Sequence, residues 1–189
     1  HRVRIVDPGG PNASKAAAGM IAPAMEAAID DVSSELADLL RKGRDLWGDF
    51  AKASGVELAC RPAEWRGPEA ETIASRLANL GFEGQIQGEV VTTREDAQVE
   101  PEAAIARLRE RLGASVICGE VAKLDAVGDG WAIITADQRL EADVVVLATG
   151  ASAAIEGTPS KTKAIVQAIE PIRGQIGRSL EPLARHVTG

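Results

Sequence analysis

The chain has 189 residues, of which 45% are hydrophobic, and its 28 acidic residues outnumber its 21 Lys and Arg, giving a net charge of −7. This content is sufficient for a core, so we expect a folded protein, and because no stretch gathers basic residues into a patch, we expect no nucleic-acid partner. The longest apolar run, residues 142–155, is shorter than the ~20 residues of a membrane-spanning helix, so we expect no membrane span.

The first predicted element is a strand over residues 3–7, where β-branched residues alternate before the turn-forming run 8–12. The strand ends at Asp7. A carboxylate at the carboxyl end of an early strand in an α/β fold can hold a ribose diol, because it accepts hydrogen bonds from both hydroxyls. An Asp before Pro-Gly-Gly is also a common turn former, so both interpretations of Asp7 stay open at this point.

Small residues dominate the next segment, residues 13–23, which runs Ala-Ser-Lys-Ala-Ala-Ala-Gly-Met-Ile-Ala-Pro. Such residues let backbone N–H groups approach a ligand closely. The same run is also typical of an Ala-rich helix start. Because Asp7 lies only a short loop upstream, we favour close approach to a cofactor.

From residue 23 the pattern predicts helices separated by short strands. Apolar residues recur at helical spacing up to Gly55, which predicts one long helix or two helices broken near Ser33-Ser34 or Gly43. The elements expected next are a short strand over 56–59, a helix over 68–80 that ends at Gly81, and one or two strands within 82–94.

A helix over residues 101–112 is better defined, because Pro101 suits its first turn and Gly113 suits a left-handed residue after its end. A strand over 114–118 follows, so the two elements form an α/β unit. Cys118 is expected to be buried in that strand.

Three further strand-like runs predict an antiparallel meander, and they cover residues 121–126, 131–135 and 140–148. Two groups of turn formers separate the three runs. The part 143–148 is apolar on both faces, which suits a strand of a parallel sheet covered on both sides. It leads into Ala148-Thr149-Gly150. These residues would lie at the carboxyl edge of the sheet, where dinucleotides bind in doubly wound folds, and a simple tight turn explains them equally well.

Few residues suggest metal or acid–base chemistry. Cys60 and Cys118 are far apart and lack a CxxC spacing, so we expect no metal site. The only histidines, His1 and His186, lie near the termini, and we identify no catalytic residue. The tail 165–189 predicts one strand, near 169–176.

Taken together, Asp7 with its turn, the Ala-Ala-Ala-Gly-Met segment and the Ala-Thr-Gly turn resemble, in this order, the glycine oxidase and D-amino-acid oxidase family of FAD-dependent enzymes. Two further segments are similar to family segments: Gln98-Val99-Glu100-Pro101 before a helix, and Pro171-Ile172-Arg173-Gly174-Gln175.

The resemblance implies an FAD site. Asp7 would bind the adenosine ribose, and the backbone of Val121 would lie against the adenine. The small-residue segment would line the pyrophosphate and flavin, and the Ala-Thr-Gly turn would close over the cofactor; the residues concerned are Ser14, Ala18, Gly19, Met20, Ala148, Thr149 and Gly150.

The resemblance also implies an α/β fold with two parts. These are an incomplete Rossmann-like FAD-binding domain, residues 1–55 and 98–164, and part of an inserted α+β substrate-binding domain, residues 56–97 and 165–189. The family's GlyXGlyXXGly turn and its substrate-binding arginine have no counterpart in this sequence. Arg173 is expected to be a structural ion-pair partner, and we expect the 189-residue chain alone not to turn over amino acids.

The activity implied is oxidation of the amine of a small amino acid, with hydride passing to the flavin and electrons then passing to oxygen. The other interpretation is a non-catalytic remnant of the fold, or a subunit of a multi-subunit amine dehydrogenase or oxidase. We expect a cytoplasmic protein, because nothing resembles a signal peptide. Its expected partners are a small amino-acid or amine substrate and either further copies of itself or a partner subunit.

Overall fold

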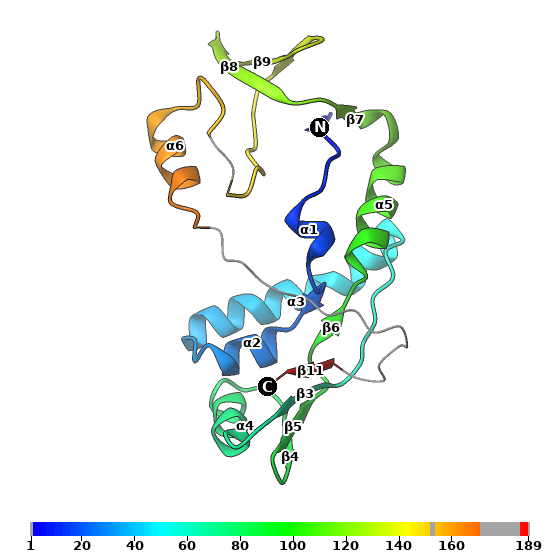
Figure 1. The fold of residues 1–189 in the computed structure, drawn as a ribbon, viewed down its shortest axis with the longest axis vertical. Helices are drawn as coiled ribbons and strands as arrows, with labels where there is room; N and C mark the ends of the chain where they lie inside the picture. The colour runs from blue at the N-terminus through cyan, green and yellow to red at the C-terminus, as the bar shows by residue number, and fades with distance from the viewer. Residues whose placement is uncertain (1, 152–153, 171–185, 189) are drawn as a thin grey trace. The chain divides into compact units, whose positions relative to one another are not determined.

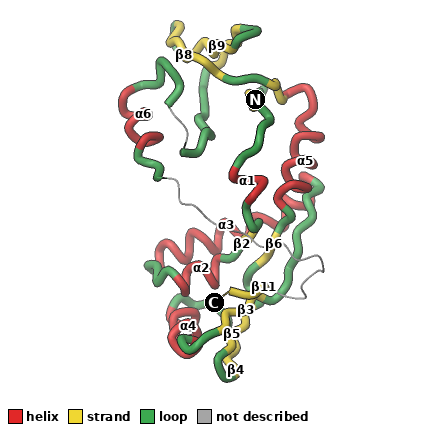
Figure 2. Tube along the Cα trace, in the orientation of Figure 1, coloured by secondary structure: helices red, strands yellow, loops and turns green. Residues whose placement is uncertain are grey.

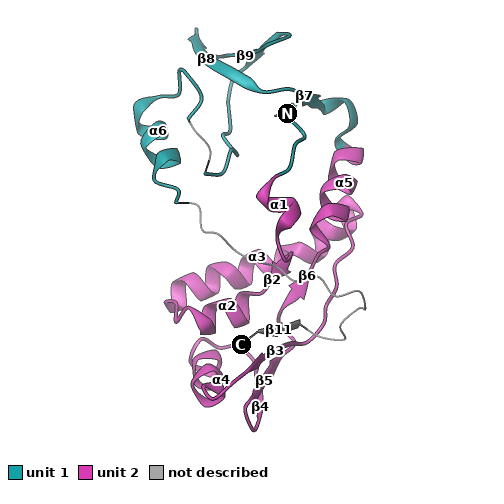
Figure 3. Cartoon of the chain, in the orientation of Figure 1, with its two compact units in different colours: residues 1–11, 112–175 teal, residues 12–111, 176–189 magenta. Residues whose placement is uncertain are grey.

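The computed structural model describes residues 2–151, 154–170 and 186–188. The chain divides into two compact units (Figure 3). Unit 1 comprises His1–Pro11 and Leu112–Gln175, and unit 2 comprises Asn12–Arg111 and Ile176–Gly189. Helices and strands occur in both units (Figure 2), so the chain has the mixed α/β character that the sequence predicts.

Unit 1 contains a parallel strand pair and an antiparallel meander (Figure 1). Strand β1 (Ile5–Asp7) pairs in parallel with β7 (Val116–Cys118), so that Asp7 lies opposite Cys118. The meander has the strand order β10-β9-β8 and consists of β8 (Val121–Val127), β9 (Gly130–Thr135) and β10 (Arg139–Ala142). A short 3-10 helix, η1 (Gly113–Ser115), precedes β7, and helix α6 (Ser160–Gln167) follows the meander.

One small core joins the two parts of unit 1. Leu124, Ile133 and Leu140 of the meander are buried together. Val6 of β1 and Ile117 of β7 pack against them. The meander therefore covers the parallel pair through the central side chain of each strand.

Unit 2 contains a four-stranded sheet, a two-stranded sheet and most of the helices. The larger sheet has the order β11-β3-β5-β4 and consists of β3 (Ala63–Arg66), β4 (Gln85–Gln87), β5 (Val90–Thr93) and β11 (His186–Thr188). The smaller sheet pairs β2 (Met20–Ile21) antiparallel with β6 (Ala97–Gln98). The helices are α1 (Ala13–Ala16), α2 (Pro23–Ile29), α3 (Ser34–Ser54), α4 (Ala70–Asn79) and α5 (Pro101–Leu112), whose last residue belongs to unit 1.

The helical pattern over residues 23–55 forms two helices, which is one of the two predicted outcomes. Asp31 has a φ of 52°, in the left-handed region, and the chain leaves the helical conformation there. The Ser33 side chain then accepts a hydrogen bond from the Leu36 N–H at 3.3 Å and caps α3. The break therefore lies at Ser33-Ser34 rather than at Gly43.

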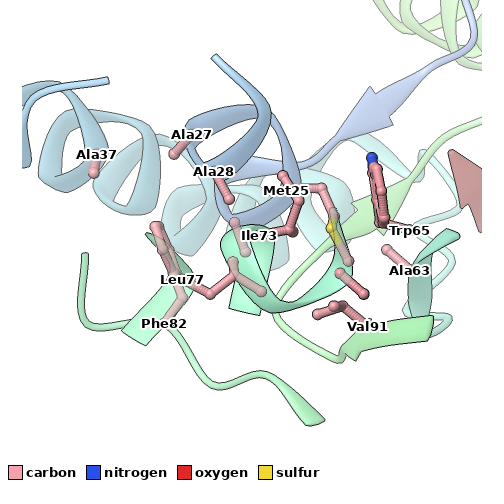
Figure 4. Packing of buried hydrophobic residues seen from close by; sticks show 12 residues of the cluster. Met25, Ala27, Ala28, Ala37, Ala63, Trp65, Ile73, Leu77, Phe82 and Val91 are labelled. Carbon is pink, nitrogen blue, oxygen red and sulfur yellow. The ribbon is translucent and has the colours of Figure 1, made fainter. Parts of the chain in front are cut away.

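The main core of unit 2 lies between one face of the larger sheet and the helices (Figure 4). Ala63 and Trp65 of β3 lie on this face together with Val91, which is opposite Trp65 in the register. Met25 of α2 and Leu77 of α4 are fully buried against them. The small residues of α2 and α3, among them Ala28 and Ala37, allow the two helices to pack closely.

Two other predicted helix ends are confirmed. Helix α4 ends just before Gly81, which has a φ of 74°. Helix α5 begins at Pro101 and runs to Leu112, and Gly113 has a φ of 49°. At both ends glycine adopts the left-handed conformation that other residues avoid.

The predicted strand over residues 56–59 is wrong. In that stretch only Ala59 makes a β-bridge, to Gln98, with both backbone N–H to carbonyl distances at 2.8 Å. The neighbouring strand β6 is only two residues long. It therefore offers too little backbone for a second full partner.

The predicted strand over 143–148 is also wrong, since β10 ends at Ala142 and no described strand pairs with these residues. Val145 and Leu147 pack against the core of unit 1. Val144 and Val146 are 75% and 83% exposed. The run is thus covered on one side only, because the described part of unit 1 supplies no second layer.

Two further predictions concern β7 and the tail. Cys118 is exposed rather than buried, because it is the last residue of a short strand, and its Sγ lies 3.8 Å from the Pro8 carbonyl oxygen. Helix α6 was not predicted, and its last three residues are the first residues of the tail. Of the predicted strand 169–176, residues 169–170 are not in a strand and the others, with Arg173, lie outside the described residues.

Candidate functional site

The carboxyl ends of β1 and β7 bring Asp7 next to the turn that leads into the meander. Asp7 ends β1 in register with Cys118, and its carbonyl oxygen accepts a hydrogen bond from the Gly119 N–H at 3.3 Å. Its side-chain Oδ1 accepts a hydrogen bond from the Gly9 N–H at 2.8 Å. The turn therefore fixes the carboxylate at the end of the strand, and the two sequence-based interpretations of Asp7 are compatible.

The other residues of unit 1 that are predicted to bind the cofactor come later in the chain. Val121 begins β8, half-buried against the unit 1 core. Ala148, Thr149 and Gly150 lie in an exposed loop after the half-covered run, and Gly150 has a φ of 62°. Nothing lies within 4 Å of a Cβ placed on Gly150.

This arrangement fits the adenosine part of a dinucleotide. A Cβ on Gly119 would also meet nothing within 4 Å, so the backbone beside Asp7 is open as well. An anchored carboxylate next to accessible main chain at the carboxyl edge of parallel strands is what a ribose and its base require. The residues present in unit 1 therefore suit FAD.

A second group of predicted residues lies in unit 2. Ser14 belongs to α1, which Asn12 caps by accepting a hydrogen bond from the Lys15 N–H at 2.9 Å. This helix ends at Ala16, Ala17 is extended, and the chain then passes through Ala18 and the left-handed Gly19 into strand β2 at Met20. The segment is therefore not a plain helix start.

Gly19 has no room for a side chain, and contacts within the protein explain this without a cofactor. It adopts a φ of 72°, and a Cβ there would lie 2.0 Å from the Val99 carbonyl oxygen and 3.0 Å from a carbon of Pro101. The Gly19 carbonyl oxygen accepts a hydrogen bond from the Val99 N–H at 2.9 Å. A larger residue would break this contact whether or not a cofactor binds, so its loss would not identify a flavin contact.

Asp96, which the sequence did not predict as a site residue, is a buried carboxylate that lies just before β6. Only 2% of it is exposed. Its oxygens accept hydrogen bonds from the first backbone N–H groups of α2, from Ala24 at 2.9 Å and from Met25 at 3.2 Å. Since these partners lie 72 and 71 residues away, no local pattern marks Asp96.

Burial raises the pKa of Asp96 from 3.8 to about 6, because the charged form loses its water. The Ala24 and Met25 N–H groups and the positive charge of Arg44 act in the opposite direction. Glu95 adds a smaller upward effect. The carboxylate is therefore poised to change its charge near neutral pH.

Arg76 binds the other end of α2. Its Nη1 donates to the carbonyl oxygens of Ala28 at 3.1 Å and Ile29 at 3.4 Å, and its Nε lies 3.2 Å from an Asp31 oxygen. A carboxylate at the amino end and a guanidinium at the carboxyl end both match the helix dipole.

A hollow of about 390 Å³ in unit 1 lies away from the Asp7 edge. It is lined mainly by residues that precede β1 and β7, which are Arg2, Val3, Arg4, Ala114 and Ser115. Ile117 of β7 and Gln138 complete the lining. It therefore marks the amino ends of the parallel strands, whereas cofactors bind at carboxyl ends.

Two absences apply to the described residues. Among them, no group of three or more His, Cys, Asp or Glu is placed to hold a metal ion. In the same ranges, no helix combines the length and apolar character required to cross a membrane.

Comparison with known proteins identifies the family. The family model for FAD dependent oxidoreductases of the DAO type matches residues 1–188. The chain belongs to this family, whose cofactor is FAD, as the sequence predicts. No curated protein matches the chain significantly.

Solved structures with a similar fold include three enzymes. Glycine oxidase from Geobacillus kaustophilus is 24% identical with a TM-score of 0.65, and the match covers 80% of this chain and 49% of that one. Iminodiacetate oxidase from Chelativorans sp. BNC1 is 18% identical with a TM-score of 0.63, covering 80% and 49%. L-proline dehydrogenase from P. horikoshii is 12% identical with a TM-score of 0.52, covering 79% and 53%. The chain thus has this fold and spans about half the length of these proteins.

Proposed function

We propose that this chain takes part in the FAD-dependent oxidation of the amine of a small amino acid, with oxygen as the final electron acceptor. The observation that carries the proposal is the family match over residues 1–188, combined with Asp7 at the carboxyl end of β1. The compounds named for the three similar structures support the substrate class. Glycine, iminodiacetate and L-proline all place an amine nitrogen one carbon from a carboxylate.

In the proposed reaction the substrate carbon loses a hydride and the nitrogen loses a proton, so that the amine becomes an imine. FAD supplies the hydride acceptor when it is bound, and oxygen takes the two electrons and two protons to give hydrogen peroxide. Among the residues described, we assign none as a general base. The part we propose for this chain is to hold the cofactor.

Asp7 is the residue we assign to the ribose. Its Oδ1 is occupied by the Gly9 N–H at 2.8 Å, which orients the carboxylate. The backbone at Gly119, which donates to the Asp7 carbonyl oxygen, is open and leaves space beside it. In unit 2, we assign Ser14, Ala18, Gly19 and Met20 to the pyrophosphate and flavin, because small residues allow close backbone approach.

Titration of the purified chain with FAD, followed by flavin fluorescence and by the absorption band near ~450 nm, tests cofactor binding. The Asp7→Asn variant keeps an acceptor for the Gly9 N–H, so the turn should persist. FAD binding should weaken by ~1–3 kcal/mol, because one buried polar partner loses its acceptor. Asp143→Asn, at an exposed acid of the same unit, is the matched control. Equal affinity for Asp7→Asn and parent would remove this assignment.

The substrate and acceptor need separate assays. Peroxide formation with added FAD, measured over glycine, sarcosine and D-alanine, tests oxidation by oxygen. Reduction of a dye without peroxide would favour a dehydrogenase over an oxidase. A chain that binds no FAD under any of these conditions would support the non-catalytic interpretation instead.

A further inference from the structure

Strand β6 and its neighbouring residues, 96–99, run alongside β2 (Figure 2). Gln98 pairs with Met20 and Ala97 pairs with Ile21 in the antiparallel β2–β6 ladder. The Val99 N–H extends this ladder by donating to the Gly19 carbonyl oxygen at 2.9 Å.

Two side chains of the same stretch bind the chain on either side of β2. The Gln98 Nε2 donates to the Ala18 carbonyl oxygen at 2.9 Å. The Asp96 carboxylate accepts the N–H groups of Ala24 and Met25 at 2.9 and 3.2 Å. The contacts therefore begin at residue 18 and end at residue 25, and they involve both backbone and side chains.

The close approach at Gly19 shows how tightly the two segments meet. A Cβ on Gly19 would lie 2.0 Å from the Val99 carbonyl oxygen, so this distance tolerates only glycine. The described chain contains no cis peptide bond. In a trans peptide the carbonyl and the following N–H point in opposite directions, so the Met20 N–H points away from Val99.

We propose that residues 96–99 form a positioning strip, which holds the backbone of residues 18–25 so that the side of residues 18–20 that lies away from the strip faces the cofactor. Asp96 and Gln98 are positioning residues, because they act through the segment they hold. This inference rests on the proposed FAD function for its cofactor part. Its structural part, that the strip holds residues 18–25 in one conformation, concerns this chain alone.

Gln98→Met is the sharper variant, since it keeps the length of the side chain, removes the donor to Ala18 and leaves the strand pairing intact. Gln87→Met, at an exposed glutamine of β4 in the same unit, is the matched control. Asp96→Asn is the second variant and keeps one acceptor oxygen for the start of α2.

Hydrogen exchange of the backbone amides of residues 18–25, measured without flavin, reports the structural part. Exchange should become about three- to tenfold faster in Gln98→Met, the change expected for one lost hydrogen bond, and should not change in Gln87→Met. Unchanged exchange in both Gln98→Met and Asp96→Asn would overturn the strip.

FAD affinity and the flavin absorption spectrum report the cofactor part. In Gln98→Met the Kd for FAD should rise by about three- to tenfold, with a shifted flavin band, while the unfolding midpoint of unit 2 stays close to that of the parent. If the parent binds FAD and Gln98→Met binds it equally with an unchanged spectrum, the positioning role is wrong. If the parent binds no FAD, the proposed function fails, and the exchange measurement alone decides the strip.

Discussion

Asp96 gives unit 2 an unusual dependence on pH. Its pKa is about 6 in the folded chain and ordinarily 3.8, so the folded state holds the proton more tightly. The stability that protonated Asp96 contributes is therefore complete below about 3.8 and is lost as the pH rises through about 6. A difference of this size corresponds to roughly 2–3 kcal/mol.

Urea unfolding of the parent and of Asp96→Asn at about pH 5 and about pH 7.5 measures this effect. Between these values the parent should lose ~1.4 kcal/mol relative to the variant, since only the parent must carry a buried charge. Glu89→Gln, at an exposed turn position, should follow the parent. A constant difference between the parent and Asp96→Asn would contradict the raised pKa.

A comparison of Gly19 with Gly88 separates the steric effect of the close approach to Val99 from the effect of backbone strain on stability. Both have a positive φ, 72° and 59°, but a Cβ on Gly88 would meet nothing within 4 Å. Gly88→Ala should lower the free energy of unfolding by about 1 kcal/mol, the usual effect of a left-handed non-glycine residue. Gly19→Ala should lower it by at least ~2 kcal/mol more, because the Val99 carbonyl must move. Similar losses for the two variants would show that β2 and β6 adjust freely.

At the scale of elements, α2 illustrates how long-range contacts define a helix. It has seven residues, which is too short for a stable isolated helix in water. Asp96 binds its first N–H groups and Arg76 binds its last carbonyl oxygens. Burial of Met25 in the sheet-facing core adds the apolar contribution. The helix therefore depends on residues from two other parts of unit 2.

The run 143–148 supplies a prediction at the same scale. Val145 packs against the core of unit 1, whereas its neighbour Val146 is 83% exposed. Val146→Asp should change the free energy of unfolding by no more than ~0.5 kcal/mol, and Val145→Asp should lower it by at least ~2 kcal/mol. Trp131, which packs against the same core, provides the fluorescence signal. Equal losses for the two variants would show that both faces are covered in solution.

At the scale of the whole molecule, the cores of the two units share no residue. Leu77 is buried in unit 2 and Leu124 in unit 1. Each Leu→Ala change should lower the free energy of unfolding by ~2–5 kcal/mol, and the two effects should add within about 0.5 kcal/mol. Replacing Trp47 and Trp65 by Phe leaves Trp131 as the reporter of unit 1. A Leu77→Ala change that shifts the Trp131 transition would show that the units unfold together.

The elements that the sequence predicted well are those with local causes. Helix α5 follows from Pro101, an apolar face and Gly113, all within one short stretch. The end of β1 at Asp7 follows from alternating β-branched residues and a dense turn signal. The family, its FAD cofactor and its mixed α/β fold followed from the order of several such segments along the chain.

Only the tertiary structure decided the features that depend on residues far apart in the sequence. Asp96 acquires its raised pKa and its two hydrogen bonds from a helix more than 70 residues away. The run 143–148 has strand-like composition but pairs with no described strand, because pairing needs a neighbour that composition does not provide. Gly19 is required by the Val99 carbonyl, 80 positions along the chain, and not by its own local sequence. Local propensity determined the elements with strong end signals, such as α5, and long-range contacts determined which strand-like runs pair and which residues are buried, charged or tightly approached.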